Sequence, residues 1–354
     1  MATQEAKAWT YIEGYPATLK LSTINPPTTA SFQDVVDGTP HILVQVHACA
    51  LNPVDIQMAN LPSWSMPWNP LNGVEKGMVC DFSGVALCSS AGFQAGDEIF
   101  GLTLQPFIPN GGALGEIADI PMDKCVAVKK PAEWSHEKAS AISLVWLTAK
   151  ACIETVEPYV DASTNKRVAI LGGSSATGIY SIILAKCKGW TVVSTSSSRN
   201  KDFIVNDLKA DKHIDYTTQD VRTALLDFAP DAVIDCVGGT EAIGLPYSRR
   251  FTTIVGDKTG RTSMAEPYTY YDYLAPHRAV AQWLRWGKGA LGLGESYDVV
   301  ILGMKAEWLE EAKQTLGEKD IYVDSMFEFE KADEAFERLN TGRARGKVVI
   351  KVSK

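Results

Sequence analysis

Residues 168–182 read VAILGGSSATGIYSI. This is the most informative stretch of the chain, because buried-type aliphatic residues lead through a glycine-containing turn into a helical pattern. A strand, a turn and a helix in this order begin a βαβ unit. Gly173, Ser175 and Gly178 take the three positions of a G-x-G-x-x-G phosphate-binding loop. Serine holds the middle position, so three interpretations stay open: a working dinucleotide loop, a degenerate one, or a turn that only packs.

The residues of this turn suit a phosphate in spite of the serine. Gly173 can supply the tight turn, and Gly178 allows the helix to pack closely on the strand. Ser175 adds one small group where the backbone must approach a pyrophosphate. Its backbone N–H can still point at the anion from the helix N-terminus, and its hydroxyl offers a further donor.

The next strand ends in hydroxyl groups and cations. An NAD site typically has an acidic residue about twenty positions after the loop, where it binds the ribose hydroxyls. Residues 190–201 read WTVVSTSSSRNK, with no carboxylate at this end. Arg199 and Lys201, together with the serines before them, suit a 2′-phosphate, because charge-assisted contacts to phosphate are strong. The pattern therefore favours NADPH over NADH, and a solvated polar turn is the alternative.

Strand and helix patterns alternate over residues 166–300, which predicts a parallel sheet covered by helices. The first third of the chain is instead rich in β-type runs broken by proline, glycine and asparagine. A length of 354 residues favours two domains. We expect an α/β protein with one β-rich domain and one doubly wound parallel sheet.

The composition of the chain indicates which binding partners and which cellular location to expect. A net charge of −8 argues against nucleic acid or an anionic membrane as the main partner. We find neither a run of eighteen apolar residues nor a signal-type N-terminus, so we expect a cytoplasmic protein. The seven cysteines are scattered without a C-x-x-C pair. We therefore expect reduced, buried thiols rather than disulfides or a zinc knot.

The order of several short motifs resembles the medium-chain dehydrogenase/reductase superfamily, in its zinc-free quinone oxidoreductase branch. The chain is similar to reticulon-interacting-protein-like oxidoreductases and to fungal trans-acting enoyl reductases. The motifs are ALNPVDIQM (50–58), CDFSGVA (80–86), AGDEIFG (95–101), WLTAK (146–150) and GRARGKVVIKV (342–352). The resemblance implies a discontinuous GroES-like catalytic domain over residues 1–130 and 318–354. It also implies a Rossmann domain over residues 131–317, with NADPH in the cleft between the two.

The resemblance further implies which residues hold the cofactor. The pyrophosphate would be held by Ser174, Ser175, Ala176 and Thr177. The 2′-phosphate end would be held by Ser198, Lys201 and Tyr216, and we add Arg199 on the basis of its charge alone. The nicotinamide end would lie near Thr148, Val237 and Gly238.

Zinc-dependent relatives need a cysteine, a histidine–glutamate pair and a further cysteine or aspartate. The first ligand region here offers Asn52 and Asp55, and the second offers Cys80 and Asp81 with no histidine nearby in sequence. We therefore expect no metal. Hydride transfer to a quinone or an activated alkene needs a positioned acceptor and a hydrogen bond to its oxygen rather than a metal or a general base.

Candidate residues for positioning the acceptor come from three segments. We expect Asn52 and Thr148 to position substrate and nicotinamide, although a structural turn role is an alternative for Asn52 and Asp55. The proposed pocket wall consists of Asp55, Met58, Trp64 and Tyr271, the last in an aromatic-rich stretch at residues 266–289.

Three functions remain open at this point. The first is an NADPH-dependent oxidoreductase that reduces a quinone or the C=C bond of an α,β-unsaturated carbonyl, acting as a monomer or homodimer on a small-molecule substrate. The second is a trans-acting enoyl reductase that serves a polyketide synthase and takes a carrier-bound acyl thioester. Basic stretches at residues 247–250 and 277–288 are candidate carrier-protein surfaces. The third is a non-enzymatic regulatory protein that binds NADPH.

Overall fold

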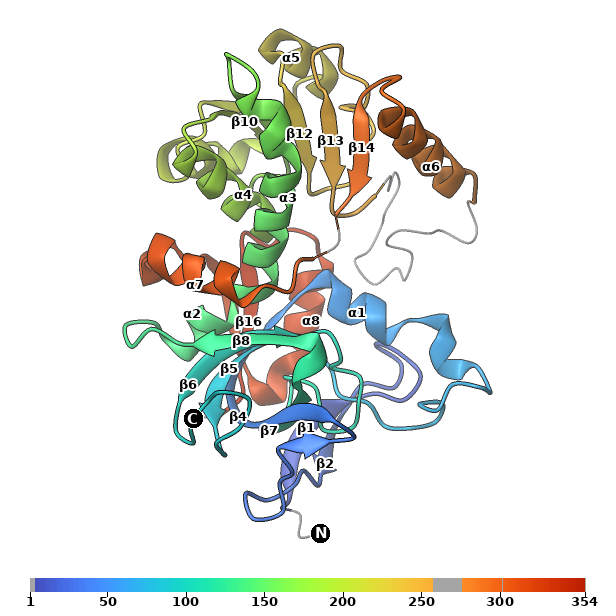
Figure 1. The fold of residues 1–354 in the computed structure, drawn as a ribbon, viewed down its shortest axis with the longest axis vertical. Coiled ribbons are helices and arrows are strands. Elements are labelled where there is room, and N and C mark those ends of the chain that lie inside the picture. Colours follow the sequence, from blue (N-terminus) through green and yellow to red (C-terminus); the bar gives the residue numbers. More distant parts are fainter. Residues whose placement is uncertain (1–3, 257–275, 301, 354) are drawn as a thin grey trace. The chain divides into compact units, whose positions relative to one another are not determined.

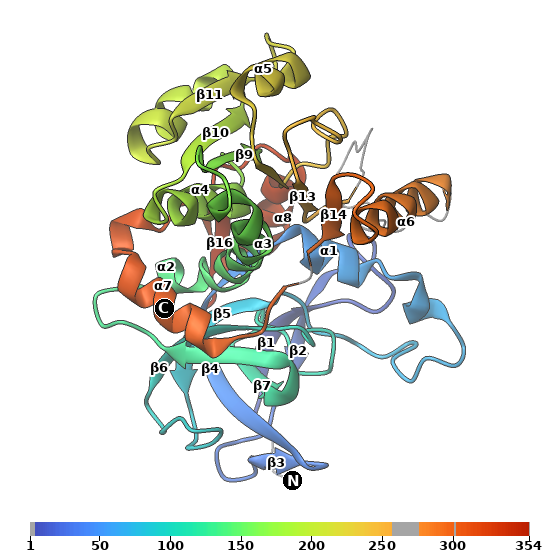
Figure 2. The same cartoon turned by 45° about the horizontal axis from the view of Figure 1, so that its top comes forward.

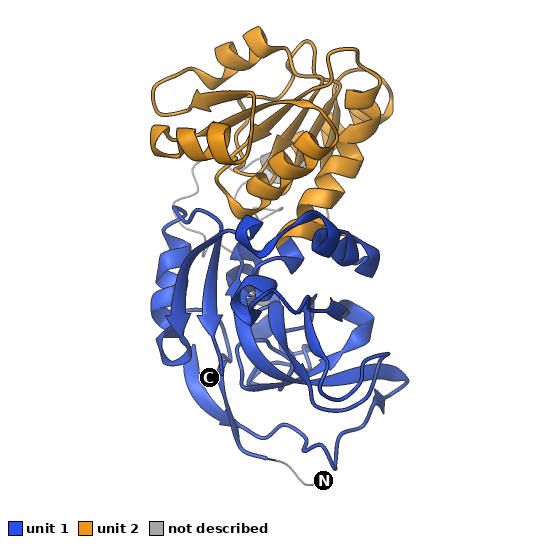
Figure 3. Cartoon of the chain, turned by 90° about the vertical axis from the view of Figure 1, so that its left-hand side faces the viewer, with its two compact units in different colours: residues 1–144, 263–267, 304–354 blue, residues 145–262, 268–303 orange. Residues whose placement is uncertain are grey.

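A computed structural model describes residues 4–256, 276–300 and 302–353, which divide into two compact units. Unit 1 comprises residues 4–144 and 304–353, and unit 2 comprises residues 145–256 and 276–303 without 301 (Figure 3). Each unit is built around its own sheet (Figure 1). Within these residues, no helix is long and apolar enough to cross a membrane.

Unit 1 is built on a sheet arranged around the long strand β4 (Thr39–Leu51), which pairs antiparallel with four other strands. The main order is β15-β16-β4-β5-β6-β8, with β3 and β7 also paired to β4. The C-terminal strand β16 (Lys347–Lys351) therefore joins the first third of the chain in one sheet. The other strands are β1 (Ala6–Thr10), β2 (Lys20–Ile24), β3 (Val35–Val36), β5 (Asp81–Ala86), β6 (Glu98–Thr103), β7 (Ile117–Pro121), β8 (Cys125–Lys129) and β15 (Val323–Glu328).

Unit 1 also contains helices and 3₁₀ turns. They are α1 (Pro53–Ala59), α2 (His136–Ser140), α7 (Ala306–Thr315) and α8 (Ala332–Asn340), with the 3₁₀ turns η1 (Pro62–Ser65), η2 (Met122–Lys124), η5 (Glu318–Asp320) and η6 (Phe329–Lys331). Helix α2 packs on β4 and β5, and α7 packs on β8. These contacts place residues 131–144 and 304–317 with unit 1, whereas the sequence analysis placed both segments with the parallel sheet. The assignment of unit 1 as a catalytic domain stays a prediction.

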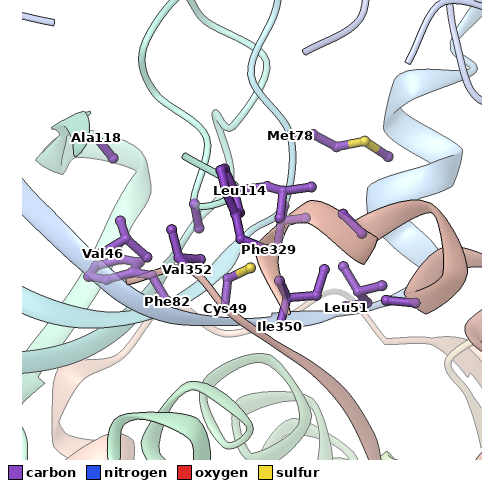
Figure 4. Close-up of a cluster of buried hydrophobic side chains, with 14 of the residues drawn as sticks. Val46, Cys49, Leu51, Met78, Phe82, Leu114, Ala118, Phe329, Ile350 and Val352 are labelled. Atoms are coloured by element: carbon purple, nitrogen blue, oxygen red, sulfur yellow. The ribbon is translucent and has the colours of Figure 1, made fainter. Parts of the chain in front are cut away.

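A hydrophobic core fills the space between the β4 sheet and α8. Val46, Cys49 and Leu51 of β4 meet Phe82 of β5 and Ile350 of β16 (Figure 4). Ile42, Val44 and Val46 alternate along the strand, and a bulge between Val46 and Ala48 shifts the register, so Cys49 and Leu51 continue the core-facing side. The burial of these side chains is the main favourable contribution to the stability of the unit.

Unit 2 contains a six-stranded parallel sheet with the order β11-β10-β9-β12-β13-β14 (Figures 1 and 2). The central strands β9 (Arg167–Leu171) and β12 (Ala232–Asp235) are almost wholly buried, as expected for a sheet covered on both faces. The predicted α/β class, with a β-rich unit and a doubly wound parallel sheet, is confirmed. The other elements are α3 (Ser143–Asp161), which begins in unit 1, α4 (Ala176–Cys187), β10 (Thr191–Ser196), η3 (Ser198–Asn200), the π-helical turn η4 (Phe203–Asp207), β11 (Lys212–Asp215), α5 (Val221–Phe228), β13 (Arg250–Thr253), α6 (Pro276–Ala290) and β14 (Ser296–Val299).

Candidate functional site

The strand order of unit 2 reverses at β9, because β10 lies on one side of it and β12 on the other. Ligands of doubly wound sheets bind at such a switch point, beyond the carboxyl ends of the strands. The turn between β9 and α4 lies at this place. Its left-handed residue is Gly172, with φ +79°, whereas the sequence analysis gave the tight turn to Gly173.

Three glycines of the turn leave no room for a side chain. A Cβ on Gly172 would lie 2.3 Å from Val237 Cγ1, and one on Gly173 would lie 2.0 Å from Ser194 Oγ. At Gly178 a Cβ would approach the Gly172 carbonyl oxygen to 2.3 Å. Gly178 thus holds the first turn of α4 against the end of β9, which is the close packing predicted for it. Gly172 was not singled out from the sequence, although its position next to Gly173 offered the signal.

Ser175 is the N-cap of α4. Its hydroxyl accepts a hydrogen bond from Gly178 N at 3.1 Å, and its own N–H donates to the Gly172 carbonyl at 2.9 Å. The next two backbone N–H groups, of Ala176 and Thr177, have no acceptor within the described residues. Unpaired N–H groups at a helix N-terminus attract an anion. The turn therefore has the donors that a phosphate needs, with serine in place of the usual glycine.

Strand β10 anchors the turn from the side. The N–H of Gly172 donates to Thr195 Oγ1 and the N–H of Gly173 donates to the Thr195 carbonyl, both at 2.9 Å. Thr195 itself is buried. These bonds fix the turn relative to the end of β10, where the predicted 2′-phosphate residues begin.

The residues predicted for a 2′-phosphate follow the neighbouring ends of β10 and β11. Ser198, Arg199 and Lys201 are exposed, and so is the ring of Tyr216, whose N–H donates to the Ser196 carbonyl at 3.3 Å. The Ser196 hydroxyl and His213 Nε2 lie 2.8 Å apart. Burial lowers the pKa of His213, and the charge of Lys201 lowers it further, while Asp215 opposes both. Lys201 and Asp215 therefore act on the pKa of His213 in opposite directions, and the effect of Asp215 is the larger of the two.

Asp235 ends strand β12 and holds the turn that follows. Its Oδ1 accepts hydrogen bonds from the N–H groups of Val237 at 3.0 Å and Gly238 at 2.9 Å, and Oδ2 accepts one from the Thr253 hydroxyl at 2.9 Å. Burial raises the pKa of Asp235 to about 6, against the lowering effect of these bonds. Gly238 is left-handed, with φ +83°, and Val237 is exposed beside Gly172. Asp235 was not predicted from the sequence, although an acid that ends an aliphatic strand before two glycines was a usable signal.

In unit 1, Asn52 belongs to a buried polar network. Its Nδ2 donates to Asp81 Oδ2 at 3.0 Å and to the Ala50 carbonyl at 3.3 Å, and its Oδ1 accepts from Lys347 Nζ. Lys347 Nζ also lies 2.9 Å from Asp81 Oδ2, with both side chains buried. Both polar groups of the Asn52 side chain therefore have hydrogen-bond partners within the protein. We therefore assign Asn52 to holding this network rather than to contacting a substrate.

Both carboxylate oxygens of Asp55 likewise accept hydrogen bonds from the protein backbone. Its Oδ2 accepts the N–H of Asn52 at 2.7 Å at the start of α1, and its Oδ1 accepts the N–H of Cys80 at 2.9 Å. Burial raises the pKa of this carboxyl to about 6. The structural turn role, which was the alternative from sequence, fits Asp55 better than the pocket wall does.

The side chains of this network do not fit a metal. Asp81 is paired with a lysine, the Asp55 oxygens are occupied by backbone N–H groups, and Asn52 provides only an amide. Across the part of the chain that the structure describes, no group of three or more histidine, cysteine or acidic residues could hold a metal ion.

The remaining predicted pocket residues lie in separate places. Trp64 is buried in the core of unit 1, where its indole N–H donates to the Met58 carbonyl at 2.6 Å and its ring lies 5.1 Å from that of Phe107. We assign it to the core, because the chain's own residues bury it. Met58 is half-buried on α1, and Thr148 is buried on α3. Tyr271 lies outside the described residues.

Comparisons with known proteins agree with this architecture. Residues 208–350 match the family described as zinc-binding dehydrogenase. The chain is 28% identical to NAD(P)H oxidoreductase RTN4IP1, mitochondrial, of Danio rerio, over 88% of this chain and 83% of that protein. It is 28% identical to trans-enoyl reductase pgmF of Aspergillus terreus, over 98% of this chain and 96% of that protein. The structure of a quinone oxidoreductase from Coxiella burnetii shares the fold, with a TM-score of 0.74 and 24% identity over 99% of this chain and 100% of that one.

Proposed function

The chain belongs to the medium-chain dehydrogenase/reductase superfamily, in its quinone-oxidoreductase-like group, and from this premise we propose that it is an NADPH-dependent reductase. Its relatives support the coarser statement of an NAD(P)H-dependent oxidoreductase. The acceptor that we propose is a quinone or the C=C bond of an α,β-unsaturated carbonyl. The predicted cytoplasmic location stays a prediction.

The observation that carries the proposal is the pairing of two anion sites along one edge of the parallel sheet. At the start of α4, the N–H groups of Ala176 and Thr177 have no acceptor among the residues that the structure describes, and they suit a pyrophosphate. Beyond the end of β10, the neighbouring strand, Arg199 and Lys201 are exposed and suit a 2′-phosphate. NADPH carries both groups on one molecule, whereas NADH lacks the second.

The chain's own residues then have separate roles. The turn at residues 172–178 would hold the pyrophosphate, with Ser174 and Ser175 lining it. The turn of Val237 and Gly238, fixed by Asp235, would lie along the nicotinamide ribose, and Thr148 near the nicotinamide. NADPH supplies the hydride when bound. The acceptor carbonyl draws electron density away as the hydride arrives, so we assign no side chain as a catalytic acid or base. We propose that water or a hydroxyl group supplies the proton.

The first experiment is a titration of the purified full chain with NADPH and with NADH, followed by nucleotide fluorescence. The proposal predicts selective binding of NADPH, and NADPH oxidation on addition of a small quinone or enone. Equal affinity for both nucleotides would contradict the assignment of the 2′-phosphate site. Selective binding without turnover of any acceptor would favour the regulatory protein that only binds NADPH.

A second candidate function is a trans-acting enoyl reductase, supported by similarity to such a protein over nearly the whole length of both chains. It predicts that an α,β-unsaturated acyl group is reduced much faster as a thioester on a carrier protein than as a free small thioester. Equal values of kcat/KM for the carrier-bound and the free thioester would favour the small-molecule reductase.

A further inference from the structure

His213 lies on β11, close to the residues predicted for the 2′-phosphate, and the function proposed above does not use it. Strand β11 pairs with β10 in parallel, so the carboxyl ends of both strands meet at one edge of the sheet (Figure 2). His213 Nε2 lies 2.8 Å from the hydroxyl oxygen of Ser196, the last residue of β10. The carbonyl of Ser196 also accepts the N–H of Tyr216 at 3.3 Å. One serine therefore joins the imidazole to the strand end from which Lys201 follows.

The hydrogen bonds at Ser196 determine which nitrogen of His213 titrates. The Ser196 hydroxyl donates to the Ser197 carbonyl at 3.1 Å, so its oxygen accepts a hydrogen bond from His213. Nε2 therefore keeps its proton, and a second proton binds at Nδ1. Because the bond to Ser196 is kept in both forms, His213 can change its charge without changing its position.

Charged groups reach this imidazole from its own strand and from the segment after β10. Burial lowers the pKa of His213, Asp215 on the same strand raises it, and Lys201, directly after η3, lowers it. The turn η4 also packs on β11 and carries Asp207, which is exposed to solvent. Helix α5 packs on the opposite face of β11, on the side of Ile214. The free protein therefore holds His213 mostly in its neutral form at pH 7.

Asp215 is an acid beside a predicted phosphate site. Its Oδ1 accepts hydrogen bonds from the hydroxyl of Thr217 at 2.7 Å and from its N–H at 3.0 Å, and these bonds lower the pKa of Asp215. The carboxylate is thus ionised at neutral pH, and it repels a phosphate. His213 is two positions away, so it lies on the same face of the strand, and its charged form would offset that repulsion.

We propose that His213 is a further residue that determines the preference for NADPH, because its imidazole takes up a proton from solvent when the 2′-phosphate binds beside Lys201. The inference rests on the proposed function, since it needs the 2′-phosphate site. A nearby phosphate favours the charged imidazole and so raises the pKa of His213. Affinity for NADPH then increases as the pH falls through the range between the two pKa values. NADH has no phosphate at this position, so its binding should leave the charge of His213 unchanged.

The test measures the affinities of the full chain for NADPH and NADH by nucleotide fluorescence, in the parent and in His213→Gln, from about pH 6 to about pH 8. Glutamine keeps an N–H for the Ser196 hydroxyl but cannot take up a proton. The 2′-phosphate itself titrates near about pH 6, which affects both proteins alike, so the parent-to-variant ratio isolates His213. For NADPH, we expect this ratio to be roughly threefold to tenfold larger at the acidic end of the range. For NADH, it should not change with pH.

His277→Gln is the matched control. His277 is exposed on α6, which packs on β14. Strand β14 is five strand spacings from β11, or roughly 24 Å, so this histidine is too far away to act on the same phosphate. The control variant should therefore keep the pH dependence of the parent.

Calorimetry in two buffers of different ionisation enthalpy gives a second readout, because it counts the protons taken up on binding. NADPH should bring more protons onto the parent than onto His213→Gln, and NADH should show no such difference. If NADPH stays preferred while the parent-to-variant ratio is constant with pH, the role of His213 is overturned and the proposed function stands. Equal losses for both nucleotides in His213→Gln would reduce the histidine to a support for the strand end. A parent that binds both nucleotides equally at every pH would overturn the 2′-phosphate site itself, and this inference with it.

Discussion

Lys347 Nζ lies 2.9 Å from Asp81 Oδ2, and this ion pair joins β16 to β5 across 266 positions of sequence. Both side chains are buried, and Asn52 bonds to both of them. The second oxygen of Asp81 accepts the N–H of Leu144 at 2.9 Å. A buried charge is tolerated only when its partners are in place. The network therefore ties the C-terminal strand to the first third of the chain.

Lys347→Met should destabilise the protein by about 3–5 kcal/mol, because it leaves the Asp81 carboxylate buried and unpaired. The measurement is equilibrium unfolding in urea, followed by circular dichroism. Asp81→Asn combined with Lys347→Met removes both charges and should recover part of that loss. A matched control is Lys351→Met on the same strand, whose side chain is partly exposed. Equal losses for the two lysines would contradict a special role for the buried pair.

Asp235 should make stability fall as pH rises through the range from about 4 to about 6. Burial raises its folded pKa to about 6 from an ordinary value of 3.8, so the folded state holds the proton longer than the unfolded state does. The contribution of this group is thus most favourable below pH 4 and decreases until the carboxyl is ionised in both states. The full change is roughly 3 kcal/mol.

The check on Asp235 is the unfolding free energy of the parent and of Asp235→Asn at several pH values. Asparagine keeps a carbonyl oxygen for the N–H groups of Val237 and Gly238 but has no proton to lose. The free-energy difference between the two proteins should therefore change with pH over this range. A difference that is constant with pH would place the Asp235 pKa near its ordinary value.

The parallel sheet of unit 2 was predictable from sequence, because its signals are local. The aliphatic run of β9, the turn after it and the spacing of α4 all lie within twenty residues of each other. The Lys347–Asp81 pair could not be predicted in this way, because the residues around each partner contain no pattern that identifies the other. Lysine at the start of a strand ordinarily indicates an exposed position.

The segment before β5 is a second place where local sequence did not determine which side chains are buried. Residues 61–77 are rich in proline, tryptophan and asparagine, and Trp64 of this segment was predicted to line the substrate pocket. Instead Trp64 is buried, and the Lys76 ammonium lies 5.4 Å from the centre of its ring while donating to the Ile12 and Val74 carbonyls. Which of two nearby tryptophans is buried depends on packing across the unit, because Trp68 is exposed.

The serine in the phosphate-binding turn can be tested directly. Ser175→Ala removes the cap on the Gly178 N–H and should cost about 1 kcal/mol of stability. Ser175→Gly, which restores the usual motif, should cost only a few tenths of that. We expect NADPH affinity to be kept in Ser175→Gly and lowered in Ser175→Ala, measured by nucleotide fluorescence beside thermal unfolding. Loss of binding in the glycine variant would mean that the serine hydroxyl itself holds the phosphate.

The cofactor preference rests on Arg199 and Lys201. Each should contribute a charge-assisted contact to the 2′-phosphate, so Arg199→Ala and Lys201→Ala should each weaken NADPH binding by on the order of tenfold or more. NADH has no group at that position, and its affinity should stay the same. Lys212→Ala is the matched control, because Lys212 is exposed at the amino end of β11, away from the carboxyl ends of the strands. If both nucleotides lost affinity equally in the Arg199 and Lys201 variants, these residues would act on the fold of the turn rather than on the phosphate.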